Sequence, residues 1–249
     1  MTKHKETVGE SVRTFNASDG WKLSGILRVP KDFQSSCAVI LVHSSHHERD
    51  AFVYGTSIVE LLAQKGIASF RFDIRGRGSS LGSQSYHEMA PLDRRKVTLD
   101  VKAAINLVIN LPGISPNNLF LIGEQDTADS VVQAAVEDPR LKGLILLSPR
   151  LSTSSTQQLE VRKIATYILL SKEDRDSLKA ATSAYLAAPQ SGSRLDLFSG
   201  LGFGTTMFMT RSFEQPKETP IQILIRDWIL ESIISMPDEV TQNQESTGQ

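Results

Sequence analysis

The sequence is poor in cysteine, in net charge and in long apolar runs. Its one cysteine, Cys37, lies in an apolar segment and excludes an internal disulfide, so we expect it to pack in the core. A net charge of -1 gives no electrostatic basis for binding nucleic acid or an anionic membrane. No run approaches the roughly 20 apolar residues of a membrane-spanning helix, and the first residues lack the apolar segment of a signal peptide. We therefore expect a cytoplasmic protein with neither nucleic acid nor membrane as a partner.

What the 249 residues do contain is an alternation of short apolar segments with amphipathic ones. This alternation predicts one doubly wound α/β domain with a mostly parallel sheet. Two segments joined by the turn Ser18-Asp19-Gly20 predict an antiparallel N-terminal edge. The eight predicted strands are residues 12–15, 23–29, 37–42, 67–72, 119–122, 144–147, 166–170 and 195–198.

The predicted helices and chain ends complete this organisation. Residues 10–235 are expected to form the domain, residues 1–9 a flexible N-terminus, and residues 236–249 a disordered polar tail. Only a short segment, 150–163, separates two of the strands, which leaves no room for a large lid domain. One helix is expected directly after the strand at 119–122, and four others over residues 54–65, 99–111, 177–188 and 220–234.

The stretch Asn118–Glu137 combines a buried strand, a sharp turn at Gly123 and a helix. A strand, turn and helix of this kind is where an α/β-hydrolase places its nucleophile, as Gly-x-Ser-x-Gly. The turn here reads Gly-Glu-Gln-Asp-Thr, so the central position is Gln125. A neutral amide is no nucleophile. The stretch therefore predicts a hydrolase scaffold that lacks the reactive group.

Four further motifs give the chain its resemblance to small α/β-hydrolases of the dienelactone hydrolase type, over roughly Val12 to Ser232. The resemblance implies the α/β-hydrolase fold, with eight strands, a mainly parallel sheet and no large lid. The order and spacing of the motifs support it more than any single motif does. They are Asp19-Gly-Trp-Lys-Leu-Ser-Gly25, Asp73-Ile-Arg-Gly-Arg-Gly-Ser-Ser80, Leu144-Ile-Leu-Leu-Ser-Pro149 and the glycine-rich loop from Ser199 to Phe208.

The same resemblance implies that the catalytic triad is degenerate. Gln125 matches the nucleophile position, Phe203 the base position and Asp174 the acid position. Because a serine triad needs its serine, its histidine and its acid together, the two replacements are expected to abolish its chemistry. β-Branched Thr127 stands where the family has a small residue, so we expect a relaxed turn.

Residues of two loops are the candidates for ligand binding. By position, the backbone N–H groups of Ser45 and Asp126 match the family's oxyanion donors. Glu124, Asp126 and Asp129 also suit the start of a helix, where carboxylates cap and complement the dipole. The expected ligand-binding set is Ser44, Ser45, His46, Gln125, Asp126 and Phe203.

Proton-transfer candidates are fewer. The candidate catalytic residues are His46, His47, Asp126 and Asp174. A histidine titrates near neutral pH, and burial can raise the pKa of a carboxylic acid toward that range. The adjacent His46 and His47 lack the separated spacing of a zinc site, so neither a metal nor a cofactor is expected.

Three functions remain open from the sequence. The first is a non-hydrolytic pseudoenzyme that binds a small acyl, lactone or terpenoid-like ligand, or else a partner protein. The second is a non-hydrolytic enzyme, such as a cyclase, lyase or isomerase, that uses the same residues for proton transfer. The third is an atypical ester or lactone hydrolase with a relocated nucleophile such as Ser44 or Ser45.

Overall fold

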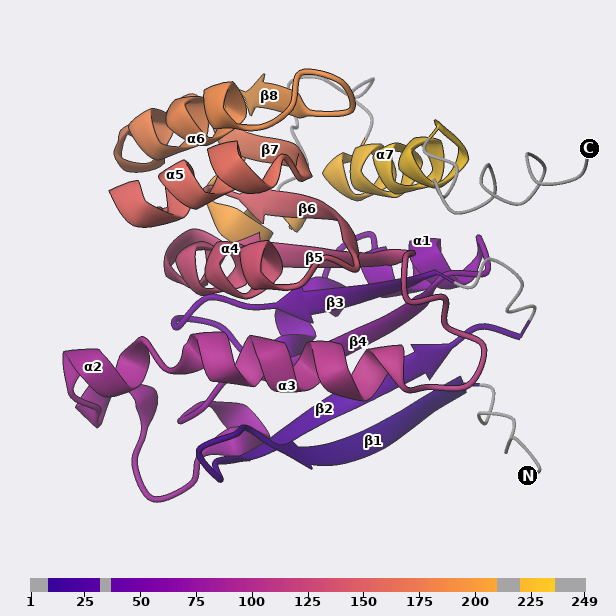
Figure 1. The fold of residues 1–249 in the computed structure, drawn as a ribbon, viewed down its shortest axis with the longest axis vertical. Coiled ribbons are helices and arrows are strands. Elements are labelled where there is room, and N and C mark those ends of the chain that lie inside the picture. The colour runs from indigo at the N-terminus through magenta and orange to yellow at the C-terminus, as the bar shows by residue number, and fades with distance from the viewer. Residues whose placement is uncertain (1–8, 32–36, 210–219, 236–249) are drawn as a thin grey trace, which may run out of the picture.

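The computed structural model describes residues 9–31, 37–209 and 220–235. Eight strands form one sheet in the order β1-β2-β4-β3-β5-β6-β7-β8 (Figure 1). The first strand pairs antiparallel with the second, and the second antiparallel with the fourth, whereas the other pairs are parallel. The strands are β1 Gly9–Asn16, β2 Lys22–Val29, β3 Ala38–Val42, β4 Ala68–Asp73, β5 Leu119–Glu124, β6 Leu141–Leu147, β7 Ala165–Ser171 and β8 Arg194–Phe198.

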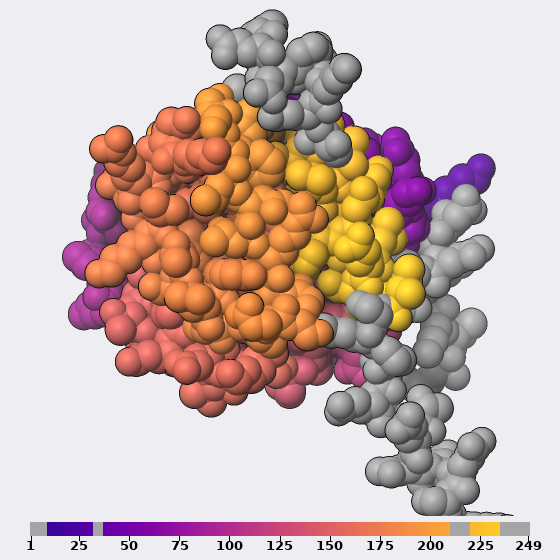
Figure 2. Space-filling view, turned by 90° about the horizontal axis from the view of Figure 1, so that it is seen from above, coloured from indigo at the N-terminus to yellow at the C-terminus, as the bar shows by residue number. Residues whose placement is uncertain are grey.

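Helices cover both faces of the sheet. α3, α4, α5 and α6 lie on one face and enclose one apolar core, while α1 and α7 lie on the other face over a second core (Figure 1). Figure 2 shows the β8 end of the molecule, where α6 and β8 adjoin α7. The helices are α1 Ile58–Ala63, α2 Pro91–Arg94, α3 Val97–Ile109, α4 Ala128–Glu137, α5 Thr153–Arg162, α6 Arg175–Ala187 and α7 Ile221–Ser235.

The predicted sheet is confirmed, with its antiparallel N-terminal edge and all eight strands. Most bounds differ from the prediction by one to three residues, and β1 begins at Gly9, inside the expected flexible end. The predicted ends 1–8 and 236–249 lie outside the described residues. Within the described ranges, no helix is long and apolar enough to cross a membrane.

One helix prediction was wrong in its start, and the helix α5 was missed. The helix expected over 54–65 begins only at Ile58, because Ser57 caps it by accepting a hydrogen bond from the Glu60 N–H and Gly55 adopts a φ of 62°. The segment 150–163 contains a helix, α5, that the sequence analysis did not predict. Its residues are mostly polar, and only Ser155 and Leu159 are buried, so it has almost no apolar stripe.

Candidate functional site

The turn after β5 keeps the strained conformation of a nucleophile turn. Gln125 has a φ of 46°, which is unusual for a residue other than glycine and costs about 1–2 kcal/mol. A Cβ at Gly123 would lie 2.7 Å from Val131 Cγ2, so α4 packs closely behind the strand and forces a sharp turn. The expectation that Thr127 relaxes the turn was therefore wrong. Thr127 is buried, and its hydroxyl donates to the Glu124 carbonyl at 2.9 Å.

Glu124, the last residue of β5, is the buried centre of the site. One carboxylate oxygen, Oε1, accepts from the Ser44 N–H at 2.7 Å and lies 2.9 Å from His47 Nδ1. The other, Oε2, accepts from the Thr205 N–H at 2.5 Å. Glu124 thus joins the loops that follow β3, β5 and β8. The expectation that it caps a helix was wrong, because its side chain turns away from α4 toward these partners.

His47 is the charged partner of Glu124. Its side chain is 25% exposed, and Arg77 Nε donates to its backbone carbonyl at 3.2 Å. The hydrogen bond to Glu124 raises the pKa of His47 above its ordinary value, although burial opposes this. Burial works against ionisation of Glu124, but hydrogen bonds from His47 and from two backbone N–H groups outweigh it and lower its pKa. Both shifts favour an ion pair between the two residues.

The Asp126 carboxylate is hydrogen-bonded to one of the two expected oxyanion donors, the Ser45 N–H. Its Oδ1 accepts from the Ser45 N–H at 3.1 Å, across the gap between the loops after β3 and β5. A carboxylate in this place competes with any carbonyl or anionic ligand for the donor. Ser45 and Asp126 are thus brought together as predicted, but they bind each other. The elbow site is defined by six residues of these two loops and the end of β5: Ser44, Ser45, His47, Glu124, Gln125 and Asp126.

The other two histidines of the loop after β3 have different surroundings. His43 is fully buried: its Nε2 accepts from the Ile74 N–H at 3.1 Å, so its Nδ1 donates to the Ser44 carbonyl at 2.7 Å. Burial lowers the pKa of His43, which fixes a neutral structural imidazole. His46 is exposed and lies against His87, with ring centroids 5.9 Å apart. The structure therefore brings His47, rather than His46, to Glu124.

The predicted acid residue is engaged as a helix cap. Asp174 follows β7 and accepts a hydrogen bond from the Ser177 N–H at 3.2 Å, at the start of α6. This hydrogen bond engages Oδ1 of Asp174 locally, within the first turn of α6.

The predicted base position lies beside the elbow. Phe203 is 45% exposed, and its N–H donates to Thr206 Oγ1 at 2.8 Å. A Cβ at Gly204 would lie 2.8 Å from Gln125 Nε2 and 2.5 Å from Glu124 Oε2. The loop after β8 thus passes directly against Gln125, at the place where the resemblance puts the base.

No family model matches the sequence. Among solved structures, the dienelactone hydrolase from Anabaena variabilis superimposes with a TM-score of 0.68 at 17% identity, over 91% of this chain and 99% of that one. DcsB in complex with its substrate analogue also gives a TM-score of 0.68, at 13% identity over 90% of this chain and 99% of that one. This chain has the α/β-hydrolase fold.

The sequence is also similar to that of one characterised protein. Thiohydrolase aneE from Aspergillus aculeatus is 25% identical over 190 residues, which is 76% of this chain. The chain spans 56% of the length of that relative.

Sequence reasoning missed three residues of this α/β-hydrolase-fold site: Glu124, Thr205 and Ser148. Ser148 follows β6 with a φ of 48°, and its Oγ accepts from the Gly204 N–H at 3.1 Å. One signal for Glu124 was present in the sequence. A charged residue ending the apolar run Leu119-Phe-Leu-Ile-Gly needs a buried partner at the carboxyl edge of a parallel sheet. Thr205 bonds Glu124 through its backbone N–H and Ser148 bonds Gly204 through its hydroxyl, and neither contact gives such a signal in the sequence.

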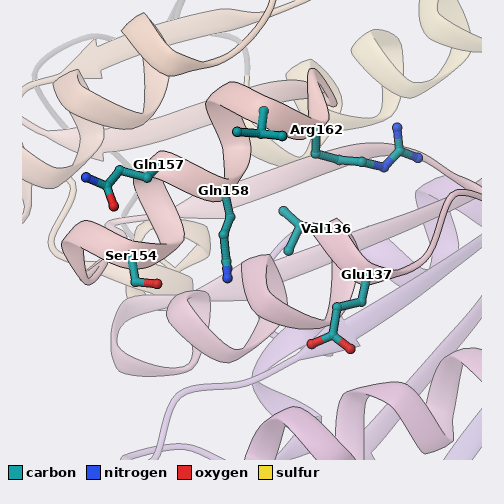
Figure 3. Close-up of a pocket in the computed structure, with 7 residues that line it drawn as sticks. Val136, Glu137, Ser154, Gln157, Gln158 and Arg162 are labelled. Carbon is teal, nitrogen blue, oxygen red and sulfur yellow. The ribbon is translucent and has the colours of Figure 1, made fainter.

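Two further features lie outside the elbow site. Among the described residues, no group of three or more histidine, cysteine, aspartate or glutamate side chains is placed to hold a metal ion. An open groove of about 540 Å³ separates the ends of α4 and α5, and Gln158 extends across it toward α4 (Figure 3). It is lined by Val136, Glu137, Ser154, Gln157, Gln158, Val161 and Arg162, none of which belongs to the predicted site.

Proposed function

We propose that this protein binds a small organic ligand at the elbow site and does not hydrolyse it through an acyl-enzyme. The observation that carries the proposal is Gln125, a neutral amide held at a φ of 46° where the fold places a nucleophile. Its amide can donate and accept hydrogen bonds but cannot attack a carbonyl carbon. In serine-hydrolase terms, the protein is then a pseudoenzyme.

The contacts around Gln125 support this function. The Ser45 N–H, which would stabilise a tetrahedral oxyanion, is bonded to the Asp126 carboxylate. Asp174 caps α6, and the base position is the half-exposed Phe203. The nucleophile and the base are therefore replaced, the acid and one of the two oxyanion donors are occupied, and the strained turn at residue 125 is kept.

The ligand class is proposed from the fold and the relatives. A dienelactone hydrolase and a thiohydrolase are among the proteins that this chain resembles, and both names denote acyl substrates. An acyl, lactone or thioester group offers a carbonyl oxygen that the Gln125 amide can bind. The exposed ring of Phe203 beside it suits an apolar or terpenoid-like body. We expect no cofactor in this function.

A fluorophosphonate probe tests the proposal. It labels activated serines, so the wild-type protein should remain unlabelled, and p-nitrophenyl esters should turn over no faster than with heat-denatured protein. The positive control is the double variant Gln125→Ser with Phe203→His, which restores a nucleophile and a base on the two positions that lie side by side. Labelling of the wild type at Ser44 or Ser45 would instead establish an atypical hydrolase.

One observation favours the second function, a non-hydrolytic enzyme that works at the same site. His47 Nδ1 lies 2.9 Å from the buried carboxylate of Glu124, a pairing of the kind that proton-transfer enzymes use.

A further inference from the structure

The pair of His47 and Glu124 has the geometry of a positioned imidazole. Glu124 is fully buried and uses both oxygens, one for His47 Nδ1 and the Ser44 N–H, the other for the Thr205 N–H. The two backbone bonds fix the carboxylate, so it cannot rotate away from the ring. The Ser44 and Thr205 hydroxyls also lie 3.3 and 3.1 Å from Nδ1. Nδ1 is therefore held by three side chains from two different loops and one strand end.

The opposite nitrogen of the ring is open. The two nitrogens of an imidazole point in divergent directions, so Nε2 faces away from Glu124. Across residues 9–31, 37–209 and 220–235, Nε2 has no hydrogen-bond partner, while the side chain is one-quarter exposed. In the neutral form of the ring, the carboxylate keeps the proton on Nδ1 and leaves the Nε2 lone pair for a ligand. The imidazole is thus oriented at Nδ1, and one quarter of its side chain is exposed.

We propose that His47 is a catalytic general acid–base, positioned by Glu124, that moves a proton to and from the carbon next to a ligand carbonyl. The inference rests on the proposed function, because the ligand occupies the same elbow site. Position 125 has no nucleophile that could attack a bound carbonyl compound. The reaction that remains for a base beside the compound is removal of the compound's acidic α-hydrogen.

The step balances without any co-reactant. His47 Nε2 removes a proton from the α-carbon, the C–H electron pair forms the C=C bond of an enolate, and the carbonyl pair moves to oxygen. The proton then returns from Nε2 to the same carbon or to a conjugated one, and the carbonyl re-forms. The side-chain N–H of Gln125 is a donor for the enolate oxygen. The expected reaction class is therefore exchange or isomerisation of a carbonyl compound.

The pH dependence follows from the charges that face His47. These are Glu124 at the end of β5, Asp126 in the following turn and Arg77 in the loop after β4. The carboxylates favour the imidazolium and Arg77 opposes it, with Glu124 giving the largest effect. Since the base must be neutral to accept a proton, proton removal should increase with pH through a pKa above the ordinary 6.5 of histidine.

Hydrogen–deuterium exchange of S-ethyl thioacetate in D₂O tests the inference. Proton NMR follows loss of the acetyl methyl signal, and a thiol reagent follows hydrolysis in the same samples. We expect the wild type to accelerate exchange. In His47→Gln the exchange rate should be lower by a factor of about one hundred or more, which is the usual contribution of a general base. His87→Gln, which removes an exposed histidine outside the site, should exchange like the wild type.

Two further variants separate catalysis from structure. Adding imidazole to His47→Ala should restore part of the exchange, which a structural role would not allow. Glu124→Gln should shift the midpoint of the pH–rate profile to lower pH, because His47 loses its carboxylate. If Glu124→Gln does not fold, the His47 variants and the rescue still decide the question.

The outcomes distinguish the inference from the function on which it rests. Exchange no faster than in buffer, or equal exchange by the wild type and His47→Gln, overturns the role of His47 and leaves the non-hydrolytic function standing. Release of ethanethiol by the wild type would overturn the non-hydrolytic function instead. Exchange that depends on His47, with no thiol release, supports both.

Discussion

Two buried charge networks lie at the carboxyl edge of the sheet, and they differ in how completely they are satisfied. Arg75, after β4, is buried and donates from Nη2 to Asp100 at 2.6 Å, from Nη1 to Asp19 at 2.7 Å and from its backbone N–H to Asp100 at 2.9 Å. Its Nε is also bonded to Asp100. In the other network, Glu124 is fully bonded but His47 keeps one nitrogen open.

The difference separates a structural network from one that can react. Arg75 ties the loop after β4 to α3 and to the β1–β2 hairpin, and each of its three side-chain nitrogens already has a partner. An arginine does not release its proton in proteins, so this network cannot transfer one. The His47 network contains an imidazole that is one-quarter exposed and can carry a proton. We therefore expect the first network to determine stability and the second to determine ligand chemistry.

The largest effect is expected from Asp100→Ala. Asp100 is fully buried, so its removal leaves the Arg75 guanidinium with only the partly exposed Asp19 as an ionic partner. Removing one member of a buried pair typically costs about 3–5 kcal/mol. Urea unfolding should show this loss in the free energy of unfolding, and Asp19→Ala should lose clearly less. Equal losses from the two variants would contradict the assignment of Asp100 as the main partner.

A smaller effect is expected from Asp126→Ala, which frees the Ser45 N–H. One hydrogen bond is lost, so the free energy of unfolding should fall by about 1 kcal/mol. The freed donor should then bind acetate, and an acetate titration should move the amide NMR signal of Ser45 only in this variant. Asp129→Ala is the matched control, because Asp129 accepts from Ser152 and Gln133 and does not touch Ser45. A Ser45 signal unmoved in Asp126→Ala would refute the idea that Asp126 blocks this donor.

The fold was predictable because its determinants are local. Apolar runs such as residues 37–42 and 119–122 specify buried parallel strands, and their order with the intervening helices leaves few topologies. Helix α5 was missed because its sequence is polar and its position depends on packing between α4 and α6. Its one large buried apolar residue, Leu159, was too little signal.

The site was predictable only in part because its contacts are long-range. Position alone identified Gln125, and chemistry alone identified His47 as a candidate base. The partner of His47 is 77 residues away in the chain, and that of Thr205 is 81 away. Glu124 was therefore interpreted through its sequence neighbours, as a helix cap, although its partners come from two other loops. Likewise, the turn at Gln125 was expected to be relaxed because Thr127 is β-branched. The close packing of α4 on β5, at Gly123 and Val131, is a feature of tertiary packing that the size of Thr127 does not reveal.

The smallest expected effect is a pH-dependent contribution of His47 to stability. The folded pKa of His47 is raised above 6.5, so its contribution is complete below 6.5 and is lost as pH rises through the folded value. The folded pKa of Glu124 is lowered below 4.5, so its contribution is present above 4.5 and is lost as pH falls through the folded value. The difference in unfolding free energy between the wild type and His47→Gln should therefore be greatest between about pH 4.5 and 6.5 and should shrink above that window. Urea unfolding across a pH series measures it, with His87→Gln to correct for the loss of one titrating histidine from the unfolded state. A difference that grows above pH 7 would mean that the folded protein holds His47 neutral, which would contradict the ion pair.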